Sequence, residues 1–342
     1  MKRSVASSVL VVVALLLGAC GSADNEAERS GEPVAVTGTT EPGAYPVTIE
    51  HRFGKTTIES APARVATVGF TDHDAVLALG VKPVGVREWY GDKPHATYPW
   101  ATAALGDAKP AIIGDGSTVN YDALTLADPD LIIAIYSGAT EDEYAKLAAI
   151  APTIVQSGAF PDWAQPWKET TRQIGRALGQ PAKADALVTG VEDKFASARA
   201  AHPELKGKTA AMGQFGDGAG TFYVLHPDDP KAGFLTELGL VIPKEIADLV
   251  VKESNEQFSF ERLDYMDQDV AVWLAGFESP ELVAEVRNHP VYGQLGVFKE
   301  KRDLFLEDGV DALSWSTVLS LPAAVDTVVP QLATAVKGTT GG

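Results

Sequence analysis

Residues 181–202 read PAKADALVTGVEDKFASARAAH and predict one long helix in the middle of the chain. Its apolar side chains recur three or four residues apart and so share one helical face. They are Ala184, Leu187, Val191, Phe195 and Ala198. Lys206, Gly207 and Lys208 mark the end of the helical pattern. A single helix of this length, placed between two similar halves, predicts a stiff strut rather than a hinge.

On both sides of this helix, apolar strand-like runs alternate with helical patterns. Before it the order is RVATVGF, DHDAVLALG, KPVGV, DLIIAIY, EDEYAKLAAIA and PTIVQS. After it the order is KTAAMGQF, AGFLTELGL, DVAVWLA, RDLFLED and a closing helix from about Ser316 to Ala335. Such alternation is typical of β-α units that form a mostly parallel sheet. The sequence therefore predicts fold class α/β, with two lobes joined by a single long helix.

The amino terminus predicts a secretory leader. The first residues, MKRSVASSVLVVVALLLGAC, contain two positive charges, a short apolar run and small residues before Cys20, which is the layout of a signal peptide. The apolar run from Val9 to Leu17 would rise only about 14 Å as a helix, too little to span a bilayer core of roughly 30 Å. Residues 21–43 are rich in Gly, Ser, Thr, Glu and Pro and lack aromatic residues, which favours a flexible tether.

These patterns divide the chain into five expected segments. They are a signal peptide at 1–19, a flexible tether at 20–44, a first α/β lobe at 45–180, the connecting helix at 181–205 and a second α/β lobe at 206–337.

Charge and cysteine content exclude several classes of function. The net charge is −18 over 342 residues, and removal of the leader with Lys2 and Arg3 makes it about −20, which argues against nucleic acid as a partner. Cys20 is the only cysteine. If it is acylated, no thiol remains for a disulfide, a catalytic nucleophile or a thiolate metal site.

An internal repeat relates the two lobes. Residues 120–124 (NYDAL) with 130–133 (DLII) correspond to 259–263 (SFERL) with 269–272 (DVAV), at a constant offset of 139 residues. In each copy an acid, Asp122 or Glu261, stands near the start of a short helix, and a second acid, Asp130 or Asp269, precedes an apolar strand. Acids near helix N-termini are favoured by the helix dipole, so helix capping is the simplest interpretation of Asp130 and Asp269.

Taken together, four segments resemble the iron-siderophore substrate-binding lipoproteins of ABC importers. They are the LGAC box, PARVATVGFTDHDAVLALGVKPVGV, VNYDALTLADPDLIIA and FSFERLDYMDQDVAVW. The resemblance covers about residues 45–337. It implies a class III substrate-binding protein with two Rossmann-like lobes, similar to the vitamin B12 and ferric-siderophore binders. It also implies lipidation of Cys20, a location on the extracytoplasmic face of the cell membrane, and a role in iron uptake.

The resemblance further implies that one acid on each lobe docks onto arginines of the membrane permease. Matched by motif, these acids are Asp122 and Glu261. The family usually has Glu at the first position, so Asp122 departs from the pattern. Two solvated surface acids with little energetic effect are the alternative interpretation. We expect a monomer that binds its ligand and the permease.

Aromatic residues follow the expected strands at the edge where ligands bind in open α/β sheets. The candidate ligand-binding residues are Arg87, Trp89, Tyr90, Tyr136 and Trp163 in the first lobe and Phe215, Trp273, Phe277 and Trp315 in the second. A siderophore encloses Fe(III) with its own oxygens, so no direct metal ligand and no cofactor is expected. Rigid rings would supply contact area and Arg87 would donate hydrogen bonds. The alternative for each aromatic residue is that its side chain packs in the hydrophobic core.

Other functions remain open at this stage. Few basic residues fall in the candidate segments, which favours a neutral or cationic ferric hydroxamate over an anionic catecholate. The same scaffold could hold haem or cobalamin. An extracytoplasmic enzyme is disfavoured because no G-x-S-x-G, H-E-x-x-H, P-loop or G-x-G-x-x-G pattern occurs in a suitable context. A direct zinc or manganese binder is disfavoured because the six histidines are scattered.

Overall fold

The computed structural model describes residues 39–90, 93–216, 220–252 and 257–338. The expected signal peptide, Cys20 and most of the tether lie outside these residues. Within the described residues, no helix combines the length and apolarity that crossing a membrane would require.

The first lobe contains a five-stranded parallel sheet in the order β5-β4-β3-β6-β7. Its strands are β3 (Val65–Thr67), β4 (Gly85–Val86), β5 (Ala111–Ile112), β6 (Leu131–Ala134) and β7 (Thr153–Val155). An antiparallel hairpin, β1 (Val47–His51) and β2 (Gly54–Ile58), precedes them. The strand order reverses direction between β3 and β6, and loops at the carboxyl ends of such neighbouring strands form the usual ligand crevice of doubly wound sheets.

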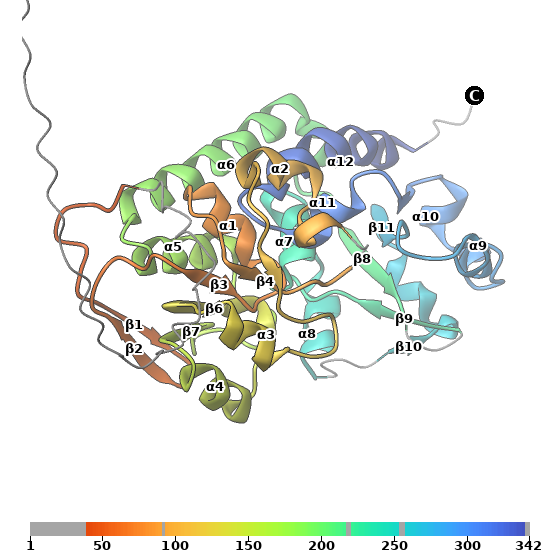
Figure 1. Cartoon of the computed structure of the whole chain (residues 1–342). Coiled ribbons are helices and arrows are strands. Elements are labelled where there is room, and N and C mark those ends of the chain that lie inside the picture. Colours follow the sequence, from red (N-terminus) through yellow and green to blue (C-terminus); the bar gives the residue numbers. More distant parts are fainter. Residues whose placement is uncertain (1–38, 91–92, 217–219, 253–256, 339–342) are drawn as a thin grey trace, which may run out of the picture. The chain divides into compact units, whose positions relative to one another are not determined.

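Helices of the first lobe connect these strands (Figure 1). They are α1 (Asp72–Ala78), η1 (Pro94–Ala96), α2 (Pro99–Leu105), α3 (Tyr121–Leu126), η2 (Ile135–Ser137), α4 (Glu141–Ala148) and α5 (Trp167–Ala177). All four residues of β6 are buried. Such uniformly apolar strands suit a parallel sheet that is covered on both faces.

The second lobe has a mixed sheet in the order β10-β9-β8-β11-β12. Its strands are β8 (Ala210–Phe215), β9 (Thr221–Val224), β10 (Phe258–Ser259), β11 (Val270–Leu274) and β12 (Asp303–Leu306). Strands β8, β11 and β12 run parallel, whereas β9 pairs antiparallel with both β8 and β10. A short connection from β8 to β9 explains the antiparallel pairing, because a parallel crossover needs a dozen or more residues.

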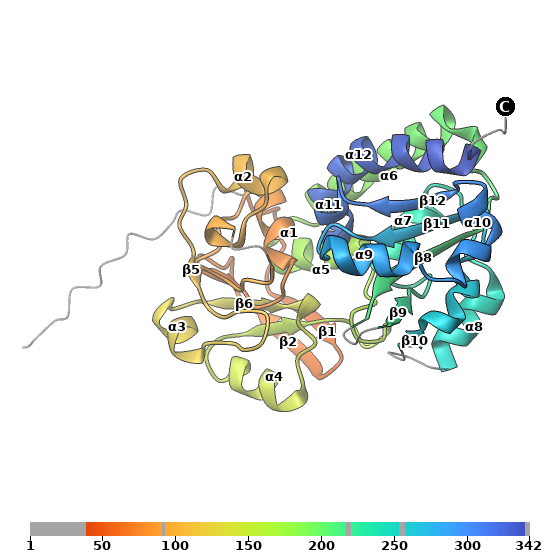
Figure 2. The ribbon, with the colours of Figure 1, turned by 90° about the vertical axis from the view of Figure 1, so that its right-hand side faces the viewer.

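Helices of the second lobe surround this sheet (Figure 2). They are η3 (Pro203–Leu205), α7 (Pro230–Glu237), α8 (Lys244–Lys252), η4 (Phe260–Met266), α9 (Pro280–Arg287), η5 (Tyr292–Gln294), α10 (Gly296–Lys299), α11 (Val310–Trp315) and α12 (Ser320–Lys337). The expected closing helix, from about Ser316 to Ala335, corresponds to α12 alone, which begins at Ser320, and a separate short helix, α11, precedes it. Ser316 adopts the left-handed conformation, with φ of 47°, and ends α11 before α12 begins.

The expected connecting helix is α6 (Pro181–Ala201). Its buried residues include Val188 in place of the expected Leu187, which is only partly buried. The first half packs on α5, where Gly175 approaches Ala184 so closely that a side-chain carbon at Gly175 would meet the Ala184 methyl at 2.3 Å. The second half packs on the second lobe, where the rings of Phe195 and Phe234 are 5.5 Å apart. The helix therefore contacts both lobes along its length.

Helix α12 runs beside α6 (Figure 1), and Lys194 of α6 pairs with Asp326 of α12 at 2.6 Å. One continuous cluster of buried apolar residues extends through these two helices into both lobes, from Val65 and Ile133 in the first to Val272 and Leu306 in the second. Because protein cores are close-packed and resist deformation, this shared core restricts movement of the lobes beside the two helices.

The internal repeat corresponds to equivalent positions in the two sheets, but its second acids are not helix caps. Asp130 accepts hydrogen bonds from the backbone N–H groups of Ala63 and Arg64, just before β3. Asp269 accepts one from Thr209, just before β8. Each carboxylate stands at the start of a central strand and binds backbone groups that precede the neighbouring strand. The expectation of helix capping was wrong, because the nearest free N–H groups belong to the adjacent chain segment.

Candidate functional site

Nine aromatic side chains gather where loops of the two lobes face one another. We call them the aromatic cluster. Its members are Phe70, Trp89, Tyr90, Tyr98, Trp100, Tyr136 and Trp163 of the first lobe and Phe277 and Trp315 of the second. Phe70 and Tyr136 follow β3 and β6, the two strands between which the strand order reverses. The position agrees with the general rule for ligand sites in such sheets.

Rings of the aromatic cluster contact one another across the two lobes. The Trp315 ring lies 5.1 Å from Trp89 and 4.2 Å from Tyr98, and Phe277 lies 5.8 Å from Tyr90. Tyr90 is 50% exposed and Phe277 is 44% exposed, whereas Trp315 is only 4% exposed. The cluster therefore has an outer part that solvent reaches and an inner part closed by Trp315.

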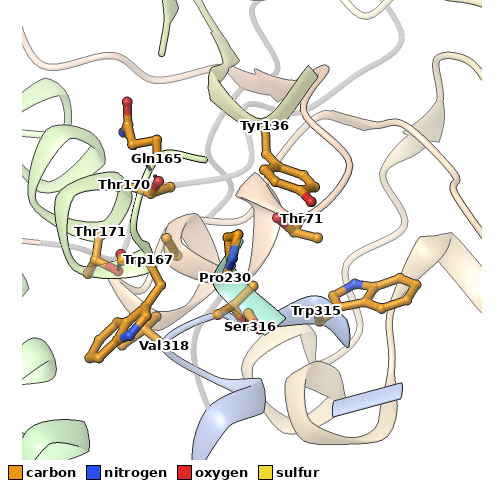
Figure 3. Close-up of a pocket in the computed structure, with 12 residues that line it drawn as sticks. Thr71, Tyr136, Gln165, Trp167, Thr170, Thr171, Pro230, Trp315, Ser316 and Val318 are labelled. Atoms are coloured by element: carbon orange, nitrogen blue, oxygen red, sulfur yellow. Dashed lines mark hydrogen bonds between the residues drawn. The ribbon is translucent and has the colours of Figure 1, made fainter. Parts of the chain in front are cut away.

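A small cavity lies behind Trp315, between the lobes. The first lobe and α5 contribute Thr71, Ala75, Tyr136, Gln165, Trp167, Thr170 and Thr171, and the second lobe contributes Pro230, Trp315, Ser316, Thr317 and Val318. Figure 3 shows Tyr136 and Trp315 approaching it from different elements. Its volume of about 20 Å³ is sufficient for a water molecule. A larger ligand requires the rings of the aromatic cluster to separate.

Tyr136 is held in place by a buried carboxylate. Asp72, at the start of α1, is 1% exposed and accepts the backbone N–H groups of Ile135 at 2.7 Å and Tyr136 at 3.1 Å. Gly69 is required beside it, because a side-chain carbon there would lie 2.0 Å from an Asp72 oxygen. Burial raises the pKa of Asp72 to about 6, although the two backbone hydrogen bonds oppose the rise.

Arg87 follows β4 and is buried at the base of the aromatic cluster. Its guanidinium lies 4.1 Å from the centre of the Phe70 ring, a cation–π contact, and its Nε donates to the Asp115 carbonyl at 2.7 Å. Burial lowers the pKa of Arg87, while the nearby acids Glu143 and Asp115 act in the opposite direction. Because a guanidinium has five N–H donors, Arg87 retains donors beyond the one used by Asp115.

A second cation, Lys231, stands on the opposite lobe at the start of α7. Its side chain is 14% exposed and its Nζ lies 3.1 Å from an Asp229 carboxylate oxygen. Burial lowers the pKa of Lys231, but Asp229 and the phenols of Tyr136 and Tyr90 more than offset this, so the pKa is raised. Pro230, the residue before Lys231, lines the small cavity between the lobes, so Lys231 stands beside this cavity.

The structure brings together seven of the nine expected site residues. Arg87, Trp89, Tyr90, Tyr136, Trp163, Phe277 and Trp315 belong to the aromatic cluster or contact it.

The other two, Trp273 and Phe215, were wrongly placed at the ligand site. Trp273 is 0% exposed and Phe215 is 3% exposed, and both lie in the hydrophobic core of the second lobe. The Trp273 indole N–H donates to the Tyr292 hydroxyl at 3.0 Å. Both residues stand on strands of a sheet whose faces are covered, so their side chains enter the core rather than the space between the lobes.

Sequence reasoning missed four members of the site: Phe70, Tyr98, Trp100 and Lys231. Phe70 ends the run RVATVGF, so the rule that placed Trp89 after a strand would also have selected it. Tyr98 immediately precedes α2 and Trp100 lies within it, and both are distant from any strand end. Lys231 lies at a helix start, and nothing local in the sequence sets it apart from other surface lysines.

The two expected docking acids are both exposed. Asp122 lies in the first turn of α3, whose N-cap residue Asn120 accepts the Ala123 N–H at 2.9 Å. Glu261 lies at the start of η4 and its side chain is 77% exposed. Leu126, four residues after Asp122 and thus on the same helical face, is 87% exposed. An exposed apolar side chain of this size is available for contact with a partner.

Among the described residues, no group of three or more His, Cys, Asp or Glu side chains is arranged to hold a metal ion. The site instead combines apolar rings with a few donors. Such a surface suits a bulky organic ligand that is bound and oriented without being chemically converted.

Known solute-binding proteins are similar to this chain in sequence and in fold. The family model described as periplasmic binding protein matches residues 65–305. The probable siderophore-binding lipoprotein YfiY of Bacillus subtilis (strain 168) is 27% identical over 270 residues, which are 77% of this chain and 76% of that protein.

Two solved structures share the fold. The periplasmic solute binding protein of Mycobacterium smegmatis is 31% identical with a TM-score of 0.71, covering 85% of this chain and 98% of that chain. PiaA of Streptococcus pneumoniae TIGR4 in complex with ferrichrome is 26% identical with a TM-score of 0.75, covering 85% of this chain and 99% of that chain.

Proposed function

Because this chain belongs to the periplasmic binding protein family, it is a solute receptor rather than an enzyme, and we propose that its solute is a ferric siderophore. The observation that carries this proposal is the aromatic cluster, in which rings from both lobes meet where the strands of the first lobe end. The similar proteins named above include a probable siderophore-binding lipoprotein and a ferrichrome complex, which supports the same ligand class.

The outer surface of a ferric siderophore matches this site in chemical character. A siderophore surrounds Fe(III) with its own oxygens and presents a partly apolar periphery. Rigid aromatic rings bury such a periphery at a low cost in side-chain entropy. Arg87 on one lobe and Lys231 on the other provide donors for the oxygens at its edge. The Trp315 indole N–H, which has no hydrogen-bond partner among the described residues, supplies a further donor.

The balance of charge favours a ferric hydroxamate over a strongly anionic ferric catecholate. Lys231 is paired with Asp229, which leaves two cations beside the rings without a salt bridge among the described residues: Arg87 at Phe70 and Lys93 at Tyr98. An anion of high charge would need several unpaired cations. A ferric hydroxamate that is neutral or nearly so needs hydrogen bonds and ring contacts, which the aromatic cluster provides.

The receptor then delivers its cargo to an ABC importer permease while a lipid on Cys20 holds it at the extracytoplasmic face of the cell membrane. Asp122 and Glu261 are exposed acids on different lobes, so each can form a charge-assisted pair with an arginine of the permease. The exposed Leu126 adds an apolar contact beside Asp122. Two such contacts orient the receptor as well as hold it.

Quenching of tryptophan fluorescence tests the ligand class directly. The full-length chain in detergent would be titrated with ferrichrome (a ferric hydroxamate), a ferric tricatecholate, haem, cobalamin and Zn(II). We expect saturable quenching with the ferric hydroxamate at the lowest concentration. Tighter binding of haem or cobalamin would replace the proposed ligand, and a tight response to Zn(II) would replace the ligand class with a bare metal ion.

A further inference from the structure

Asp74 forms a direct polar contact between the lobes. It lies in α1 of the first lobe and is 0% exposed. Its Oδ2 accepts a hydrogen bond at 2.5 Å from the hydroxyl of Thr317, which belongs to the turn between α11 and α12. The same oxygen accepts the indole N–H of Trp100 at 2.8 Å. One carboxylate oxygen thus binds an aromatic residue of its own lobe and a hydroxyl of the other.

The Thr317 hydroxyl has little freedom to turn elsewhere. It accepts the backbone N–H of Ser320 at 3.0 Å, and the Thr317 N–H donates to the Ser320 hydroxyl at 2.9 Å. These reciprocal bonds begin α12, in the manner of a capping box. With its acceptor role used by Ser320, the hydroxyl proton is directed at Asp74.

Trp315 is two residues away and shares this fixed turn. It is the last residue of α11, and Ser316 after it adopts φ of 47°. The Trp315 ring contacts Tyr98 at 4.2 Å and Trp100 at 6.2 Å, and Tyr98 stacks on Trp100 at 4.9 Å. Asp74 therefore holds both the turn that carries Trp315 and one of the rings on which Trp315 rests.

Stability alone does not account for an acid at this position. A buried carboxylate without a cationic partner destabilises a fold. The Oδ1 of Asp74 has no hydrogen-bond partner among the described residues. The Nε2 of His73 lies 3.7 Å from it and also lacks a hydrogen-bond partner there. Burial raises the pKa of Asp74 and lowers the pKa of His73, so both groups are held toward their neutral forms.

We propose that Asp74 is a positioning residue, which sets the place of Trp315 in the ligand site through its hydrogen bond to Thr317. The proposal rests on the proposed function for its role in binding, but the position of Trp315 can be measured without any ligand. Two matched substitutions separate the hydroxyl from the shape of the side chain. Thr317→Val removes the donor and keeps the volume, whereas Thr317→Ser keeps the donor and removes a methyl group.

The first experiment is ¹⁹F NMR of the full-length chain in detergent, labelled with 5-fluorotryptophan and free of ligand. The Trp315 resonance is assigned by its loss in Trp315→Phe. We expect Thr317→Val to shift or broaden this resonance, Thr317→Ser to leave it in place, and the resonance of Trp273, in the second-lobe core, to stay unchanged in both. A Trp315 resonance that is the same in Thr317→Val as in the unaltered chain overturns the proposal.

Asp74→Leu examines the same contact from the other side and replaces Thr317→Val if that variant does not fold. The leucine side chain has a similar size but cannot accept the hydrogen bonds that Asp74 accepts from Thr317 and Trp100. The Trp315 resonance should therefore move at least as far as in Thr317→Val, and adding Thr317→Val should move it no further. Independent effects in the double variant would show that the two residues do not act through one bond, which also overturns the proposal.

A binding arm links the position of Trp315 to function. We expect Thr317→Val to weaken ferrichrome quenching about tenfold and Thr317→Ser to weaken it less than about threefold. If the resonance moves and the unaltered chain binds no ferric siderophore, the positioning role stands and the proposed function fails. The resonance could also move while Thr317→Val and Thr317→Ser bind ferrichrome equally well. In that case Asp74 positions Trp315 without an effect on binding, and the functional part of the inference is wrong.

Discussion

The indole ring of Trp315 lies 5.1 Å from the indole ring of Trp89, although the two residues are on different lobes. Every ring contact of Trp315 among the described residues is with the first lobe, whereas Trp89 contacts Trp315 and three rings of its own lobe. The pair marks the point where a ligand bound between the lobes would displace these two side chains.

Truncation of either ring should weaken ligand binding. We expect Trp89→Ala and Trp315→Ala to lower ferrichrome affinity about tenfold or more, because buried aromatic residues at the centre of a site contribute most of its binding energy. Fluorescence quenching or calorimetry measures the affinity.

Trp273→Ala is the matched control for loss of an indole. Trp273 is in the second-lobe core, so its truncation should cost about 3–5 kcal/mol of stability without a specific effect on the remaining folded protein's affinity. Unaltered affinity in both Trp89→Ala and Trp315→Ala would assign these rings to packing alone.

Asp72 should make stability depend on pH between about 4 and 6. Its pKa is about 6 in the folded chain, against 3.8 for an aspartate exposed to water. Within this window the folded chain holds a proton that the unfolded chain has lost, so the contribution of Asp72 to the free energy of unfolding falls as pH rises.

Asp72→Asn does not titrate and removes this contribution. Between pH 3 and pH 7, the unaltered chain should therefore lose about 3 kcal/mol of unfolding free energy relative to Asp72→Asn. Urea unfolding at a series of pH values measures it. A constant difference across the series would mean that the carboxyl titrates as it does in the unfolded chain.

Reversal of the charge on the two proposed docking acids should separate transport from binding. We expect Glu261→Lys to reduce cellular uptake of the ferric siderophore strongly while its affinity for the receptor stays unchanged, because a lysine would repel an arginine of the permease. Asp122→Lys should act in the same direction on the other lobe. Uptake of ⁵⁵Fe-labelled siderophore is the measurement.

Asp193→Lys makes the same charge change on an exposed position of α6 and serves as the control. If all three variants transport equally well, neither acid contributes to docking. If Asp193→Lys also impairs uptake, the effect is one of overall charge rather than of a specific contact.

Ligand binding should change the separation of the lobes little. The shared apolar core along α6 and α12 joins both lobes, and a packed core resists large hinge rotation. Small-angle scattering of the chain with and without ferric siderophore should therefore give nearly equal radii of gyration. A large compaction on binding would show that α6 bends or that the core separates.

The fold was predictable from the sequence in its main features. The apolar face of residues 181–202 and the β-α alternation around it indicated two α/β lobes and one connecting helix, because periodicity reports which side of an element is buried. The antiparallel β9 and β10 were not predictable, since strand direction depends on pairing partners. The second acids of the repeat, Asp130 and Asp269, were recognised as related, but their hydrogen bonds to preceding segments arise only when strands become neighbours.

The sequence by itself determined the residue types at the ends of the strands, and hence that Arg87, Trp89, Tyr90 and Tyr136 would share one edge of a sheet. Only the tertiary structure decided which rings face the other lobe, because Trp273 and Trp315 both follow apolar segments, yet one enters a core and the other crosses to Trp89. It also brought Asp74 to Thr317, 243 positions apart. Hydrophobic patterns in the sequence indicate which side of a helix or strand is buried. Contacts between the lobes depend instead on how the surfaces of the two folded lobes fit together.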